Sequence, residues 1–100
     1  MTTSPVERST AFAQNVVVTD DTLNVDLVDG RTISVPIAWY PRLAHGTPAE
    51  RDKWELIGRG EGIHWPELDE DISVENLLSG ARSGESQRSF KKWLESRGAA

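Results

Sequence analysis

Apolar and polar residues alternate along three short segments in the first third of the chain, at residues 12–18, 23–27 and 33–35. A period of two is typical of β-strands that bury one face. In the first segment the alternation would place four residues on that face, namely Phe12, Gln14, Val16 and Val18. The pattern therefore predicts strands that share one apolar face.

The turns between these segments determine how the strands pair. A two-residue turn at residues 20–21 predicts that Val18 pairs with Leu23 and Val16 with Val25. Before the third strand, a two-residue turn would reverse the faces of that strand, because the side-chain period is two. A three-residue loop at residues 28–30 keeps the apolar face and puts Gly30 where a left-handed backbone favours glycine. It predicts two further pairs, Val25 with Ile33 and Leu23 with Val35.

Residues 37–54 contain the helical segments that would cover this face. A short helical turn would bring three apolar residues together, at Ile37, Tyr40 and Leu43. Thr47 is a good N-cap, with Pro48 at the first helical position and Glu50 three residues after the cap. We predict that this helix runs to about Trp54.

The stretch from residue 54 to residue 80 mixes extended and helical signals. Residues 54–57 and 63–66 read as extended, and the glycines between them allow a bulge or a close backbone approach. They do not form a phosphate-binding loop, because the Lys-Ser/Thr ending is missing. Ser73 is a plausible N-cap for a helix over residues 74–79 that ends at Gly80. A last helix is predicted over residues 85–97.

Composition limits the class of protein. One hundred residues make one domain, and the absence of cysteine excludes disulfides and thiolate metal sites. Neither a signal peptide nor a membrane span is visible in the sequence, so we expect a cytoplasmic protein. The net charge of −5 argues against a general nucleic-acid binder. Residues 60–81 carry six acids and no Lys or Arg, whereas residues 82–100 carry five bases and two acids.

Three parts of the chain follow from these patterns. Residues 1–10 are short, polar and predicted to be disordered. Residues 11–80 are predicted to form an α+β domain, a small antiparallel β-meander sheet covered on one face by short helices. Residues 81–100 are predicted to form a linker and a short, amphipathic, basic C-terminal helix with an apolar stripe at Phe90, Trp93 and Leu94.

The most concentrated set of titratable residues is His64, Glu67, Asp69, Glu70 and Asp71. Its spacing matches neither the calcium-binding loop nor a zinc pattern, so no metal or cofactor is predicted. One interpretation is that the acids form a solvated face and precede a helix N-terminus. The alternative is an acidic surface that meets a basic partner.

A second candidate set is Arg42, Arg51 and Arg59, which could clamp a carboxylate or phosphate. The alternative is that these arginines pair with acids inside the domain. The tryptophans also have two interpretations. In so small a domain a tryptophan is more often part of the hydrophobic core, whereas an exposed tryptophan would anchor an interface with a partner.

Several segments together resemble a bacterial family, domain of unknown function (DUF) 2442. They include LVDGRTISVP, WYPRL, WEL and, as the most specific run, IHWPELDEDIS at residues 63–73. The resemblance covers residues 13–80 and implies a small α+β fold similar to the N-terminal domain of a nitrifier protein, in which a helix-turn-helix domain follows. Here the tail has room for one helix only.

The family has no established activity, so the resemblance supplies no catalytic residues. Its members are often encoded beside a second small family, domain of unknown function 4160. This pairing implies a two-gene, toxin–antitoxin-like system in which the present family is the antitoxin and the small basic partner comes from the adjacent gene.

We therefore expect a protein–protein interaction module rather than an enzyme. The predicted partner-binding residues are Glu67, Asp69, Glu70, Asp71, Trp65, Phe90 and Trp93. One alternative is a DNA-binding transcriptional autoregulator that uses the basic tail, although direct nucleic-acid binding is not favoured by the charge. Another is a small enzyme or ligand-binding protein that uses His64 and the nearby carboxylates. A homodimer is a further alternative to a partner from another gene.

Overall fold

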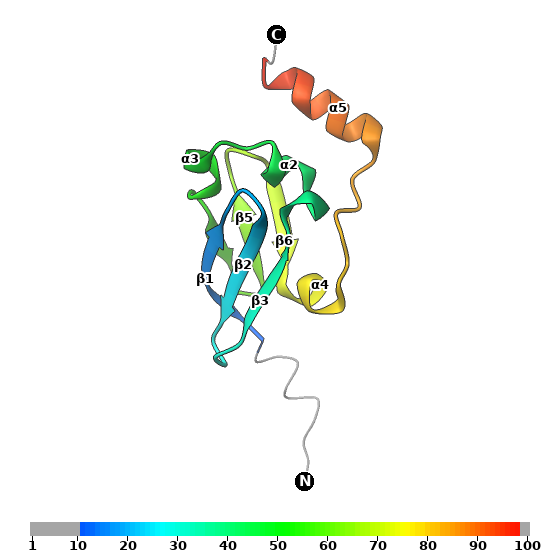
Figure 1. The fold of residues 1–100 in the computed structure, drawn as a ribbon. Coiled ribbons are helices and arrows are strands. Elements are labelled where there is room, and N and C mark those ends of the chain that lie inside the picture. Colours follow the sequence, from blue (N-terminus) through cyan, green and yellow to red (C-terminus); the bar gives the residue numbers. More distant parts are fainter. Residues whose placement is uncertain (1–10, 99–100) are drawn as a thin grey trace.

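Two small antiparallel sheets form the centre of the molecule (Figure 1). The computed structural model describes residues 11–98. The first sheet contains β1 (Ala13–Val18), β2 (Thr22–Leu27) and β3 (Thr32–Pro36), in that order. The second contains β4 (Glu55–Ile57), β5 (Gly62–Trp65) and β6 (Glu70–Ser73), also in chain order. Residues 1–10, for which disorder is predicted, lie outside the described part of the chain.

Short helices connect the sheets and end the chain. The connection contains the 3-10 helix η1 (Ile37–Trp39), α2 (Pro41–Ala44) and α3 (Pro48–Arg51). After β6 come α4 (Val74–Ser79) and α5 (Gln87–Ser96). In Figure 1, α2 and α3 lie at one end of the sheets, and α5 lies beyond α2 at that same end. The predicted α+β class with a C-terminal helix is confirmed.

The first sheet has the predicted register. Val16 pairs with Val25 and Val18 with Leu23, and on the other side of β2 the pairs are Leu23 with Val35 and Val25 with Ile33. Gly30 has φ 98°, as the three-residue loop requires. One detail was wrong. A bulge between Ala13 and Asn15 breaks the alternation, so Ala13 is buried and Gln14 is exposed.

The second sheet was not predicted as a sheet. The extended segments were recognised, but the acids at residues 69–71 were placed ahead of a helix. The structure instead turns at Asp69, which has φ 53°, and forms β6. Trp65 pairs with Glu70 and His64 with Asp71. The strand β6 is difficult to recognise in the sequence because it is mostly polar, and Ile72 is its one buried residue.

The helix signals were correct in position, and α4 has its predicted bounds, whereas α3 is shorter than predicted. Thr47 and Glu50 form the predicted capping box, yet α3 ends at Arg51 rather than near Trp54. Ser73 caps α4, and Gly80 ends it in the left-handed conformation. The buried core contains residues from both sheets and from the connecting helices. Its completely buried members include Leu23, Leu27, Leu43, Ile63, Trp65 and Leu68.

The C-terminal segment packs on the domain from which it extends. The Tyr40 hydroxyl donates to the Ala81 carbonyl oxygen at 2.8 Å, and the Ser83 N–H donates to the Trp39 carbonyl oxygen at 3.1 Å. Farther along, the Trp93 side chain is buried and belongs to the same core. The stripe that the sequence predicts on α5 therefore docks on the chain's own surface.

Candidate functional site

The predicted acidic surface lies on β6 and the turn that precedes it. The side chains of Asp69 and Asp71 are 86% and 68% exposed, and that of Glu67 is partly exposed. Each of these three has a counter-ion in the same chain. The partners are Lys53 for Glu67, at 2.9 Å, Arg42 for Asp69, at 3.5 Å, and His64 for Asp71. Exposed pairs of this kind are weak, so a binding partner could displace them at little cost.

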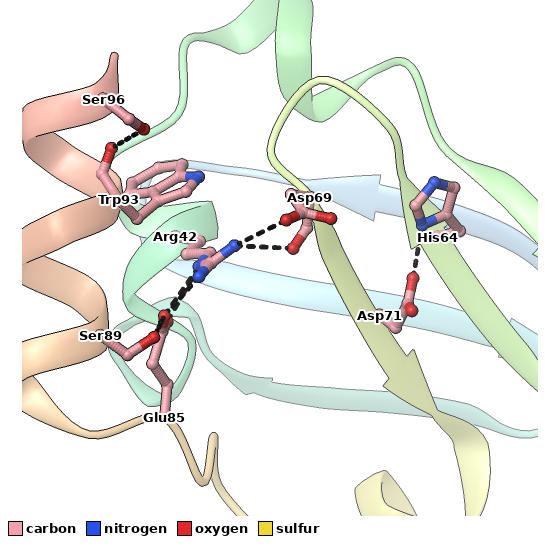
Figure 2. Close-up of polar contacts among 8 residues, drawn as sticks. All are labelled: Arg42, His64, Asp69, Asp71, Glu85, Ser89, Trp93 and Ser96. Atoms are coloured by element: carbon pink, nitrogen blue, oxygen red, sulfur yellow. Dashed lines mark hydrogen bonds and ion pairs between the residues drawn. The ribbon is translucent and has the colours of Figure 1, made fainter. Parts of the chain in front are cut away.

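His64 and Asp71 face each other across β5 and β6 (Figure 2). The Nδ1 atom of His64 contacts the Asp71 carboxylate, and Glu55 lies opposite His64 on β4. The hydrogen bond to Asp71 raises the pKa of His64, and Glu55 adds to the effect. The interaction stabilises a protonated imidazole between two carboxylates, one on each neighbouring strand.

Glu70 differs from the other acids of the cluster. Its side chain is half-buried, and no side chain among residues 11–98 makes a hydrogen bond or ion pair with its carboxylate. Burial raises the pKa of Glu70 to about 7; nearby Arg42 opposes this shift and Glu85 adds to it. A carboxylate in such surroundings is costly to ionise unless a cation comes close.

Glu70 lines a groove of about 630 Å³ between β6 and the chain that leads to α5. One side consists of residues 69–73 and the other of residues 82–86, with Tyr40 and Arg42 between them. The lining is mostly polar and carries four carboxylates against two guanidinium groups. The carboxylates belong to Asp69, Glu70, Asp71 and Glu85, and the guanidinium groups to Arg42 and Arg82. His64 is not part of this lining.

Arg42 connects three parts of the structure around this groove (Figure 2). Its Nε atom donates to the Glu85 carboxylate at 2.9 Å, and Nη1 donates to the Asp69 carbonyl oxygen at 2.8 Å. Glu85 also accepts a hydrogen bond from Ser89 on α5, at 2.7 Å. The pKa of Glu85 is lowered, chiefly by its hydrogen bond to Arg42. Arg42 is therefore already neutralised by the chain itself.

The predicted anion clamp is not assembled. Arg51 is buried, and its guanidinium donates to the carbonyl oxygens of Leu43 and Ala44, both at 2.9 Å, and to Asp20 at 3.0 Å. Arg42 is held by Glu85, while Arg59 is exposed in the turn between β4 and β5. Arg42 and Arg51 do pair with acids of their own chain, but only the pair of Arg42 with Asp69 joins an arginine to one of the acids at residues 67–71, and their other partners are Glu85 and Asp20.

Two of the predicted aromatic contacts are buried and the third is half-buried. Trp65 has no exposed surface, and its indole Nε1–H donates to the Arg51 carbonyl oxygen at 3.0 Å, so its assignment as a partner-binding residue was wrong. The guanidinium groups of Arg42 and Arg97 each lie over the Trp93 ring, at 5.2 and 4.7 Å from its centre. Phe90 is half-buried against Trp93 and His45. In this conformation these rings contribute to intramolecular packing rather than to a free surface.

Sequence reasoning missed the groove itself. It joins β6 to residues 82–86, of which 82–84 were predicted as a linker and 85–86 as the start of the last helix. The short polar sequence of that segment gave no periodic signal. The one indication was Glu85, one of two acids in a basic tail, which could have been matched to an arginine in the domain.

The family model for "Protein of unknown function (DUF2442)" matches residues 13–83. The chain belongs to this family. The match extends three residues beyond the resemblance drawn from the sequence (83 against 80) and so reaches the docked segment after α4. The DUF2442 description assigns no activity, and no curated protein matches the chain.

Two solved structures are similar to this DUF2442 chain. A protein of unknown function from Rhodospirillum rubrum is 25% identical, with a TM-score of 0.65 over 77% of this chain and 95% of that one. An uncharacterised protein from Chromobacterium violaceum is 21% identical, with a TM-score of 0.66 over 93% of this chain and 82% of that one. The second likeness shows the fold alone.

Two further findings concern the described residues. Within residues 11–98, no three His, Asp or Glu side chains are arranged to hold a metal ion. No helix in that part of the chain has the length and apolar character needed to cross a bilayer.

Proposed function

We propose that this chain is a protein-binding module, the partner-masking component of a two-gene, toxin–antitoxin-like pair. Its partner is a small basic protein, and the binding surface comprises Glu67, Asp69, Glu70 and Asp71. We name these four residues the acidic surface. We assign the protein no catalytic role.

The observation that carries this proposal is the position of the acidic surface beside an open, net-acidic groove. Asp69 and Asp71 are largely exposed at its rim, and Glu70 lines it without a counter-ion from residues 11–98. Residues 60–81 themselves carry no Lys or Arg, and the counter-ions of Glu67 and Asp69 are Lys53 and Arg42 from earlier in the chain. Such a surface attracts a basic partner and sets its orientation.

Co-expression with the adjacent gene product tests the proposal. A tag on one component should recover a stoichiometric complex, and the combined substitutions Glu67→Lys, Asp69→Lys and Asp71→Lys should weaken it by about 100-fold or more, since close charge pairs at interfaces are strongly coupled. A matched control reverses three exposed acids elsewhere, at Asp21, Asp52 and Glu95. Equal loss in both variants would show a net-charge effect and contradict the assignment of the surface.

A second candidate function is DNA binding by α5. Arg88, Lys91 and Lys92 are exposed, and their spacing puts them on one face of the helix. Because phosphate contacts release counter-ions, this hypothesis predicts DNA affinity that falls steeply with salt and is lost when the three residues become Glu. Salt-independent or absent binding to duplex DNA would exclude it.

A further inference from the structure

β6 is the outer strand of the second sheet, and its far edge is unpaired. It bonds to β5 on one side, and no other strand within residues 11–98 pairs with it. The Val74 N–H donates to the Glu61 carbonyl oxygen at 2.9 Å, which shows which way the backbone groups alternate. Ile72 and Glu70 therefore direct their backbone groups to β5, whereas Asp71 and Ser73 direct theirs away from the sheet.

This free edge opens into the groove already described. Residues 69–73 form one wall, and the opposite wall, residues 82–86, lies outside any helix or strand. The space of about 630 Å³ between them is in the range of sites that hold a ligand rather than a single water molecule. An exposed strand edge beside such a space is the arrangement that accepts an added strand from a peptide.

Glu70 supplies the second, independent feature of this site. Its half-buried carboxylate lines the groove, and the charged groups that surround it are Arg42 from α2 and Glu85 and Asp71 from the two walls, with the Tyr40 hydroxyl nearby. Arg42 is bonded to Glu85 and to the Asp69 carbonyl oxygen rather than to Glu70. The groove thus holds one carboxylate whose natural partner would be a cation from outside the chain.

We propose that the groove binds an extended segment of the protein partner, which adds to β6 as an outer strand and places a lysine or arginine side chain against Glu70. This inference rests on the proposed function and names the chemistry of the segment. In an antiparallel pairing, one residue exchanges both backbone hydrogen bonds with Asp71. The next residue along the segment then lies opposite Glu70, where its side chain can reach the carboxylate.

The probe is a short blocked peptide of alternating threonine and valine with one central lysine, titrated into the full chain by calorimetry. A second peptide replaces the lysine by glutamine, and a third carries N-methyl groups on the two residues that flank the lysine. The lysine peptide should bind at least about 10-fold more tightly than either of the other two peptides. The glutamine peptide lacks the charge that would meet Glu70, and the N-methylated peptide lacks backbone N–H groups that would bond to β6.

Two matched variants each remove one carboxylate. Glu70→Gln removes it from the groove, and Glu95→Gln removes it from the exposed face of α5. Glu70→Gln should remove the preference for lysine over glutamine, and Glu95→Gln should keep it. Equal binding of all three peptides, unchanged preference in Glu70→Gln, or no binding at millimolar peptide would each overturn the inference. The charge-reversal test on the co-expressed complex is separate, so a failed groove site and a failed protein-binding function are distinguishable.

Discussion

The two sheets have the same strand order, yet they present different outer strands. In the first sheet, alternate residues of β2 enter the core together with Ala13 and Val16 of the bulged β1, and the register follows from apolar side chains. In the second sheet the strands are shorter, β4 is exposed along its whole length, and β6 carries acids beside a groove. The comparison teaches that apolar burial fixes one sheet, while the other leaves much of its outer strands exposed.

The largest expected effect comes from the core of the second sheet. Trp65→Ala removes a fully buried side chain and should lower the free energy of unfolding by about 3–5 kcal/mol. Val17→Ala, at an exposed position of the first sheet, should change it by less than about 0.5 kcal/mol. Chemical denaturation followed by far-UV circular dichroism measures both. Similar values for the two variants would mean that Trp65 is not part of a packed core.

The next effect separates a buried arginine from an exposed one. Arg51→Ala removes the donor to the Ala44 carbonyl oxygen and one of two donors to the Leu43 carbonyl oxygen, which also accepts from the Gly46 N–H, and should cost about 2–4 kcal/mol. Arg59→Ala changes an exposed turn and should cost less than about 0.5 kcal/mol. Thermal unfolding of both variants under one buffer condition provides the measurement. If Arg59→Ala destabilised the protein more, the assignment of Arg51 as a structural residue would be wrong.

A smaller effect concerns how Glu70 makes stability depend on pH. Its pKa is raised from 4.5 to about 7 in the folded protein, so the unfolded chain loses this proton first as pH rises. The free energy of unfolding should therefore fall between about pH 4.5 and 7 and stay constant for this group above that range. Glu70→Gln should remove this decrease, worth roughly 1–2 kcal/mol after screening by solvent.

Glu95→Gln is the control for that measurement, because Glu95 is exposed on α5. Denaturation curves at a series of pH values give the free energy of unfolding as a function of pH. The slope of that plot should be the same in the control as in the unmodified chain. If the free energy of unfolding of Glu70→Gln had the same pH dependence as that of the unmodified chain, Glu70 would not be the group responsible for the decrease.

The smallest effect is on His64, across the outer face of the second sheet. Its pKa is raised by the hydrogen bond to Asp71, so the stabilising interaction is present below its usual pKa and is lost as pH rises through the raised value. Asp71→Asn should return the pKa of His64 toward 6.5. Proton NMR titration of the His64 imidazole measures this. A raised pKa that persists in Asp71→Asn would assign the shift to Glu55 instead.

Local chemistry made much of the fold predictable. The pairs in the first sheet, the left-handed Gly30 and the capping box at Thr47 were each predicted from neighbouring residues. The bulge at Ala13 was not, because it depends on a contact far along the chain, the Ala13 N–H bond to the Gly60 carbonyl oxygen at 2.8 Å. β6 was missed for a related reason. Its residues show no apolar alternation, and the strand is defined by its pairing with β5.

The candidate site was predictable only in part. The sequence identified the acids, but their surroundings differ in ways that the sequence does not encode locally. Glu85 is held by Arg42, whereas Glu70 lines the same groove without such a partner from the described chain. Burial raises the pKa of Glu70, whereas the hydrogen bond to Arg42 lowers the pKa of Glu85. Which acid stays uncompensated depends on packing between segments that are far apart in sequence.

The sequence by itself determined the α+β class, the first sheet's register and the capped starts of α3 and α4, because alternation, turns and caps act over a few residues. Tertiary structure alone decided that Trp65 and Trp93 are buried, that Arg42 and Arg51 are neutralised within the chain, and that β6 faces a groove. Burial and ion pairing depend on which distant segments meet, and that is set when the two sheets and α5 pack together.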